Sequence, residues 1–217
     1  RSALPYAWIP VLFGIQQLLE GALWLTFPDR APLLNTVLTH AYSFFSHVLW
    51  PVYIPVAVLL MEPLGWRHRA LNVFVAAGAT VGAYLMYALV AFPVVSKPTG
   101  QHIEYDSPHF FAAVTMTLYL LSTVISPLLS THRMVQVFGA LALLSFGAAY
   151  AFYATWFISV WCFFAGVLSV IVVMYFTDPR RTALIRGAIR PSCHRRKSSS
   201  TRARRARRPC RTSATRS

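Results

Sequence analysis

The sequence predicts an all-α protein, a polytopic transmembrane helical bundle with six spans in this chain. Three observations lead to this prediction. Hydrophobic residues make up 56% of the 217 residues and the mean hydropathy is +0.52, which is high for a soluble domain. Apolar runs long enough to cross roughly 30 Å of hydrocarbon as helix recur along the chain. Finally, 14 of the 20 Lys and Arg residues lie in residues 178–217, so the preceding part is nearly neutral.

The predicted spans follow one another with short polar breaks between them. Clusters of Pro, Gly and charged residues interrupt the apolar sequence at 28–30, 62–65, 93–108 and 130–133. The fifth and sixth runs are separated only by Ala154 and Thr155. We therefore expect one transmembrane domain, residues 1–177, followed by a tail, residues 178–217. The six predicted spans are residues 5–27, 34–61, 70–92, 110–129, 134–153 and 156–176.

The tail and the loops predict the orientation of the chain. The tail is rich in Arg, Ser, Thr and Ala, a composition typical of disorder, and its positive charge indicates the cytoplasmic side of a plasma membrane. Counting back, Arg67, Arg69 and Arg133 also fall on the cytoplasmic side, and the long loop 93–109 falls outside. The tail should bind anionic lipid of the bilayer at about 1 kcal/mol per basic residue near the surface. Nucleic acid is the lower-ranked partner, because tethering beneath a membrane already explains the charge.

A stripe of small residues in the third span indicates close helix packing. Gly78 and Gly82 are four residues apart and lie on one face of a helix. Such stripes are common within helical bundles. We therefore expect packing within one chain rather than homodimerisation.

The first two spans contain polar and ionisable side chains. Gln16, Gln17 and Glu20 lie in the first span, and His40 and His47 lie in the second. An ionisable group at the centre of a membrane helix costs about 2.5 to 3.5 kcal/mol on the insertion scale, so it marks a functional-site hypothesis. Small uncharged groups such as these glutamines commonly serve as interhelical contacts, and this is the competing interpretation.

Glu20 and His40 lie at similar depths on consecutive antiparallel spans. At the rise of an α-helix, Glu20 lies about 10 Å and His40 about 9 Å from the outer end of its span. A carboxylate and an imidazole that face each other at this depth can share a proton or hold a cation. The sequence therefore predicts an interacting pair in the outer half of the bilayer.

The second span places further polar groups on the same face as His40. Ser43 and His47 follow at helical spacing. Pro51 lacks an amide hydrogen, so it should kink the helix and leave the carbonyl oxygen of His47 free. A binding site in this region would contain Glu20, His40, Ser43 and His47, with Gln16 and Gln17 one turn deeper.

The outer loop concentrates potential metal ligands. His102, Glu104 and Asp106 point to one side if the segment is extended, and His109 follows. Imidazole and carboxylate would suit a divalent metal such as zinc, with His102, Glu104 and His109 as ligands. The alternative is structural, because Asp106 or Ser107 can cap the helix that begins near residue 108. The loop lies on the same side as Glu20 and can form a lid over the polar site.

These observations leave three classes of function open. The first is binding or translocation of a small cation, a proton or a polar solute. The second is a metal-dependent membrane hydrolase that acts on a lipid or a small amide, with Glu20 as acid or base and the histidines as ligands. The third is a non-catalytic membrane scaffold whose tail binds partners.

Several stretches resemble an uncharacterised family of bacterial multi-pass membrane proteins, a domain of unknown function. The resemblance covers residues 5–176. It implies one further helix before this chain, hence seven spans in the full-length family, and it implies no known activity. Members end soon after the last span, so the Arg-rich tail departs from the pattern. The stretches that carry the resemblance are FGIQQLLEG at 13–21, YSFFSHVLWP at 42–51, HIEY at 102–105, SPH at 107–109, and 156–163.

A second, fainter similarity is to membrane hydrolases of the ceramidase and progestin-receptor type. The spacing of Ser43 and His47 resembles the Ser/His helix motif of those proteins. They also need a histidine pair on the last helix, and residues 156–176 contain no histidine. This departure argues against catalysis by their mechanism.

Overall fold

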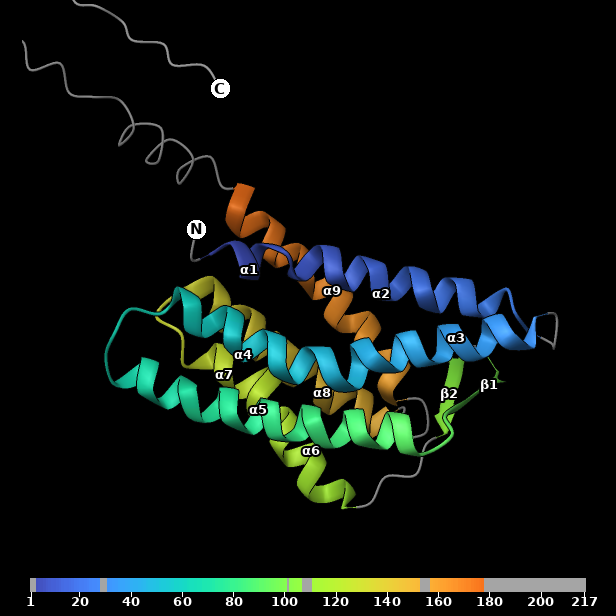
Figure 1. The fold of residues 1–217 in the computed structure, drawn as a ribbon. Helices are drawn as coiled ribbons and strands as arrows, with labels where there is room; N and C mark the ends of the chain where they lie inside the picture. The colour runs from blue at the N-terminus through green and yellow to red at the C-terminus, as the bar shows by residue number, and fades with distance from the viewer. Residues whose placement is uncertain (1–2, 28–30, 101, 107–110, 153–156, 178–217) are drawn as a thin grey trace, which may run out of the picture.

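The computed structural model describes residues 3–27, 31–100, 102–106, 111–152 and 157–177. These residues form a bundle of helices with a small β-hairpin across one end (Figure 1). The helices are α1 (Leu4–Ala7), α2 (Ile9–Trp24), α3 (Pro32–Ser43), α4 (Trp50–Met61), α5 (Trp66–Ala91), α6 (Ala112–Leu120), α7 (Ser126–Leu128), α8 (Arg133–Phe152) and α9 (Phe157–Thr177). Two π-helical turns, η1 (Phe44–Leu49) and η2 (Leu121–Ile125), join α3 to α4 and α6 to α7, and the strands are β1 (Val95–Thr99) and β2 (His102–Asp106).

The predicted apolar runs are mostly helical in their described residues, with turns at Trp8 between α1 and α2 and at residues 25–27 after α2. Three of these helical segments are long and apolar enough to cross a membrane, namely Pro32–Met61, Trp66–Ala91 and Arg133–Phe152. Ala112–Leu128 and Ser159–Met174 are shorter apolar helices. The break predicted at Ala154 and Thr155 lies outside the described residues, as does the tail, residues 178–217.

Successive helical segments alternate in direction, so the loops gather at two ends of the bundle (Figure 1). The α4–α5 and α7–α8 connections meet at one end, where the Arg67 guanidinium donates a hydrogen bond to the Ser130 carbonyl oxygen at 3.4 Å. The sequence placed the loops of Arg67 and Arg133 on one side of the bundle, and this grouping agrees with the structure. We call this the Arg67 end.

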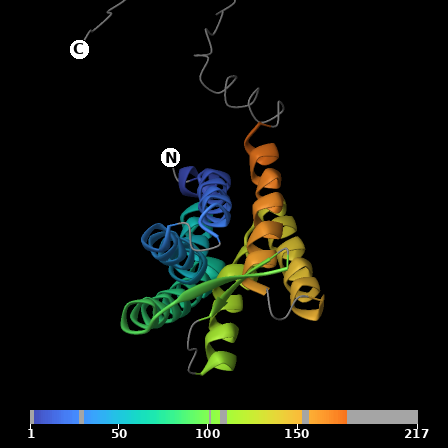
Figure 2. The same ribbon diagram turned by 90° about the vertical axis from the view of Figure 1, so that its right-hand side faces the viewer.

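The opposite end carries the β-hairpin, which an all-α fold class does not include. The strands β1 and β2 are antiparallel, and Thr99 pairs with His102 next to the turn. Gly100 in this turn has φ +65°, a left-handed conformation that glycine adopts without steric cost. Figure 2 looks onto this end and shows the hairpin crossing it towards α9. Ile103 of β2 is buried, so this loop of mostly polar sequence has an apolar side chain packed against the helices.

Hydrogen bonds connect β1 to α3. The hydroxyl groups of Ser96 and Thr39 lie 2.8 Å apart, and the Ser96 hydroxyl donates to Asn35 Oδ1 at 3.3 Å. Asn35 in turn donates to the Thr26 hydroxyl at 2.8 Å. This partly buried network joins the end of α2, the start of α3 and the hairpin.

The helix distortion predicted at Pro51 takes the form of the π-helical turn η1. The Trp50 amide bonds to the Phe45 carbonyl, five residues back, and residue 51 has no amide hydrogen. The Ser46 carbonyl oxygen therefore accepts neither from the Trp50 amide nor from residue 51. The Tyr119 hydroxyl donates to it instead, at 2.5 Å. The sequence predicted a free carbonyl on His47; the π register moves the exposed acceptor one residue earlier, to Ser46.

The small-residue stripe of α5 packs against this distorted helix. A Cβ atom added to Gly78 would lie 1.8 Å from the Pro51 carbonyl oxygen and 3.1 Å from Ser122 Cβ. One added to Gly82 would lie 2.8 Å from Val52 Cγ2. The predicted packing within one chain is confirmed.

Candidate functional site

Glu20 is a buried carboxyl group on α2. Its side chain is 7% exposed, and Oε1 accepts a hydrogen bond from the Ser159 hydroxyl of α9 at 2.5 Å. A buried carboxylate is costly unless several donors or a positive charge balance it. Among the described residues Ser159 is the one donor to Glu20, which leaves most of the acceptor capacity of the carboxyl group unused.

A pocket of about 490 Å³ opens beside Glu20 between α2 and α9. Its polar lining consists of Gln17, Glu20, Ser159 and, from strand β2, His102. The aromatic side chains of Trp24, Phe163 and Phe164 complete the wall and are partly exposed at the surface of the bundle. We call this cavity the α2–α9 pocket. Its size lies in the range of small-molecule sites in proteins.

Two buried tyrosine hydroxyls, those of Tyr42 and Tyr105, lie near Glu20. The rings of Tyr42 and Tyr105 are stacked with centroids 4.6 Å apart, so the hairpin is packed directly onto α3. Both hydroxyl groups are buried, and neither has a hydrogen-bond partner among the described residues. The Tyr42 hydroxyl lies near the Glu20 carboxyl. Burial, with a smaller effect of Glu20, raises the pKa of Tyr105, so its phenol stays protonated and is available as a donor.

The two glutamines occupy different positions. Gln16 is fully buried, and its Oε1 accepts a hydrogen bond from Trp50 Nε1 at 2.6 Å. Gln17 lines the α2–α9 pocket and packs against Gly166 of α9. The Nε2 atoms of both glutamines are buried without a hydrogen-bond partner among the described residues. Gln16 therefore has a structural contact on one atom, and Gln17 belongs to the pocket.

The predicted pairing of Glu20 with His40 is wrong in this structure. His40 Nδ1 bonds to the Thr36 carbonyl oxygen at 2.8 Å, one turn earlier on α3. Glu20 instead accepts from Ser159, and no ion pair joins Glu20 to His40. The physical reason is that His40 finds an acceptor within its own helix, while the side chain of Glu20 faces α9.

Ser43 and His47 also interact within their own helix. His47 Nδ1 lies 3.1 Å from the Ser43 carbonyl oxygen and 2.8 Å from the Ser46 hydroxyl. The Ser43 hydroxyl is buried without a partner among the described residues. The structure thus brings together Glu20, Gln17 and the hairpin, while His40, Ser43 and His47 lie outside the lining of the α2–α9 pocket.

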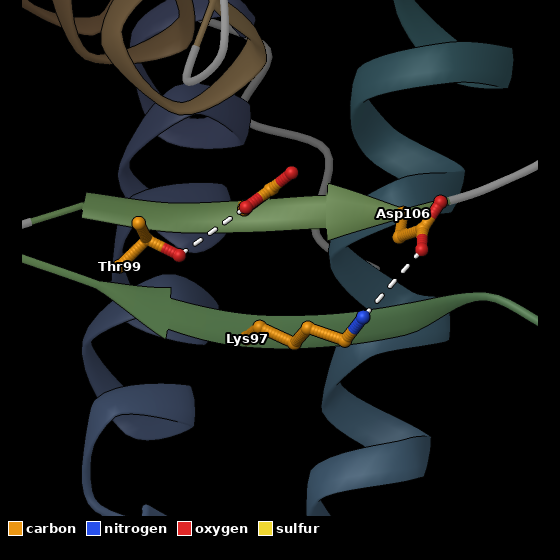
Figure 3. A network of polar contacts seen from close by, with 4 residues as sticks. Lys97, Thr99 and Asp106 are labelled. Atoms are coloured by element: carbon orange, nitrogen blue, oxygen red, sulfur yellow. Dashed lines mark hydrogen bonds and ion pairs between the residues drawn. The ribbon is translucent and has the colours of Figure 1, made fainter.

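The described residues do not form the metal site predicted in the outer loop. Glu104 accepts a hydrogen bond from the Thr99 hydroxyl at 3.2 Å, and Asp106 pairs with Lys97 at 3.6 Å (Figure 3). No three His, Cys, Asp or Glu side chains gather closely enough for a metal ion within the described ranges. The third predicted ligand, His109, lies outside those ranges. His102 is half-buried and lines the α2–α9 pocket, and the predicted lid over the polar site stays a prediction.

Sequence reasoning missed several residues of this site. Ser159 was overlooked because one serine in an apolar helix is a weak signal, although Cys162 lies one turn further and also faces Tyr42. Tyr42 is adjacent to the predicted face of the second span. Trp24 has the position of an interfacial aromatic residue, which hides its role in the pocket.

The chain belongs to the family of unknown function DUF6629, which matches residues 1–187. This bears out the resemblance to an uncharacterised family. The comparison with curated proteins and the comparison with solved structures each found no match, so neither supports the similarity to membrane hydrolases. Most of the Arg-rich tail lies beyond the matched residues.

Proposed function

We propose that this protein is a polytopic membrane protein of six spans whose α2–α9 pocket binds a small cation through Glu20. The unsatisfied carboxyl group at the wall of an accessible pocket is the observation that carries the proposal. The sequence left a small cation, a proton or a polar solute open as the ligand. Of these, a cation best complements the Glu20 carboxyl group. Translocation of the cation would follow from alternate access to the same site.

The membrane setting is supported by the distribution of apolar side chains. Large hydrophobic residues are exposed on several helices, among them Leu18 on α2 at 75%, Val90 on α5 at 76% and Leu144 on α8 at 69%. Such a surface is stable in lipid and prone to aggregation in water. With the basic tail on the cytoplasmic side of a bacterial plasma membrane and drawn to anionic lipid, the pocket lies in the outer half of the bilayer.

The charges around the pocket also support a cation. Among the described residues, no Lys or Arg side chain lines it. The lysine of the hairpin, Lys97 on β1, forms an ion pair with Asp106. An uncompensated carboxyl group in a low-dielectric site either carries a proton or holds a cation, so the two compete for Glu20.

Cation binding by the purified full chain tests this proposal. The protein is placed in phosphatidylglycerol nanodiscs and titrated with potassium, ammonium and tetramethylammonium chlorides by isothermal titration calorimetry. We expect at least one cation to bind, and Glu20→Gln to weaken that binding by about tenfold or more, since one lost charge-assisted contact is worth about 1.5 to 3 kcal/mol.

The matched control is Glu104→Gln, because Glu104 is a carboxylate of the hairpin that does not line the pocket. It should change the affinity less than about twofold. Equal binding by the wild type and Glu20→Gln, or no binding of any cation, would reject the proposal.

Nothing in the described residues favours the hydrolase alternative over cation binding. It requires three metal ligands around a reactive water, and the described part of the chain gathers no such group. The scaffold alternative gives no role to the pocket or to the buried polar atoms around it. Cation binding accounts for both.

A further inference from the structure

We infer that the cation is an organic ammonium group, held between the Glu20 carboxylate and the aromatic wall of the α2–α9 pocket. This inference rests on the proposed function and adds the chemical class of the ligand. The ammonium group is either that of a free small molecule or that of a lipid headgroup, since both offer the same chemistry.

The ligand set of the pocket is unsuited to a bare metal ion. A dehydrated Ca²⁺ ion takes six to eight oxygen ligands, and Mg²⁺ takes six in near-ideal geometry. Within the described part of the chain, Glu20 is the only carboxylate in the lining, and no cluster of three metal-binding side chains occurs. The volume of about 490 Å³ also exceeds the space that one ion needs. A larger cation that needs few directional ligands fits better.

The aromatic side chains supply what an ammonium group needs. Trp24, Phe163 and Phe164 line the same pocket as Glu20. A cation over an aromatic face gains about 0.5 to 2 kcal/mol, and recognition of quaternary ammonium ligands commonly combines several rings. Trp24 packs edge-on against Phe27, with centroids 6.2 Å apart, which restricts its orientation. One carboxylate and three aromatic rings thus form a site suited to an alkylated ammonium group.

The pocket is accessible from the side of the bundle. Trp24 is 37% exposed, Phe163 55% and Phe164 37%. All three line the pocket between α2 and α9, together with His102 of the hairpin. In a membrane these side chains would meet the lipid near the headgroup region, where aromatic belts occur. An ammonium group can therefore enter laterally as part of a lipid or from the aqueous side next to His102.

Choline and its neutral isostere 3,3-dimethyl-1-butanol test the inference. Both are titrated into the full chain in phosphatidylglycerol nanodiscs, which contain no amine headgroup. We expect choline to bind and the alcohol to bind at least tenfold more weakly. Trp24→Leu should weaken choline binding by about 2- to 30-fold, the range that corresponds to one cation–π contact. Trp8→Leu, at the far end of the same helical segment, is the control and should have no effect.

The outcomes separate the two proposals and the two sources. If potassium binds through Glu20 while choline does not, the ammonium inference is overturned and the cation site stands. Equal affinity for choline and the alcohol, or for the wild type and Trp24→Leu, also overturns the inference. If choline binds, a repeat in phosphatidylcholine nanodiscs identifies the source: loss of choline binding by competition indicates a lipid headgroup, and unchanged binding indicates a free solute.

Discussion

Two carboxyl groups are buried in the described part of the chain, and they differ in how their hydrogen bonds are satisfied. Glu62, at the Arg67 end, is 6% exposed and Glu20 is 7% exposed, so burial alone does not distinguish them. Glu62 accepts from the Ser130 hydroxyl at 3.1 Å and from the Thr131 amide with both oxygens, at 3.0 and 3.1 Å. Among the described residues, Glu20 accepts a hydrogen bond only from Ser159, and it lies beside a pocket. The comparison teaches that the number of donors, rather than depth, separates a structural carboxylate from a candidate binding group.

The same contrast extends to the packing of the helices around each site. Gly78 of α5 touches the backbone of Pro51, whereas Gly21, next to Glu20 on α2, has nothing within 4 Å of an added Cβ. Gly78 lies at a close-packed contact between α4 and α5, whereas Gly21 lies beside the pocket between α2 and α9. Stability should therefore depend on the first region and ligand binding on the second.

The largest effect on stability is expected from Gly78→Ala. Its Cβ would lie 1.8 Å from the Pro51 carbonyl oxygen, so the backbone of α4 or α5 must shift, at a cost of about 3 kcal/mol or more. Gly21→Ala should leave the free energy of unfolding unchanged or raise it by up to about 1 kcal/mol. Denaturant-induced unfolding of the purified protein, followed by tryptophan fluorescence, measures both. A loss of less than 1 kcal/mol for Gly78→Ala would contradict the close packing.

Glu62→Gln should have the next largest effect, a loss of about 2 kcal/mol in the free energy of unfolding. In the variant, the amide nitrogen is a donor that faces the donors Ser130 and Thr131, so at least one hydrogen bond is lost. The remaining bonds are no longer strengthened by the carboxylate charge. Glu20→Gln should lose less than about 0.5 kcal/mol, because the amide oxygen can still accept from Ser159. Comparable losses in the two variants would remove the distinction between the sites.

Tyr119→Phe should have the smallest effect, about 1 to 2 kcal/mol. It leaves the Ser46 carbonyl oxygen without the donor that replaces its helical partner. Tyr42→Phe is the matched control, since the buried Tyr42 hydroxyl has no hydrogen-bond partner among the described residues. It should leave the free energy of unfolding within about 0.5 kcal/mol of the wild type. The prediction fails if removal of the Tyr42 hydroxyl costs as much as removal of the Tyr119 hydroxyl.

The sequence by itself determined the positions of the helices and the residues worth attention. Apolar length and the breaks between runs are local properties, so the helical segments fall where they were predicted. The cost of burying a charge depends on residue type, which singled out Glu20 before any partner was known. The spacing of Gly78 and Gly82 likewise predicted a close helix contact, because it depends only on helical periodicity.

Only the tertiary structure decided which groups meet. Glu20 and Ser159 are 139 residues apart, and their contact depends on the rotation of α2 and α9 about their axes, which helical periodicity does not specify. His40 was expected across the helix interface, but a carbonyl within its own helix was already in reach. The hairpin formed because Ile103 and Ser96 find a buried surface on the folded helices, and such a surface exists only once distant segments have packed together.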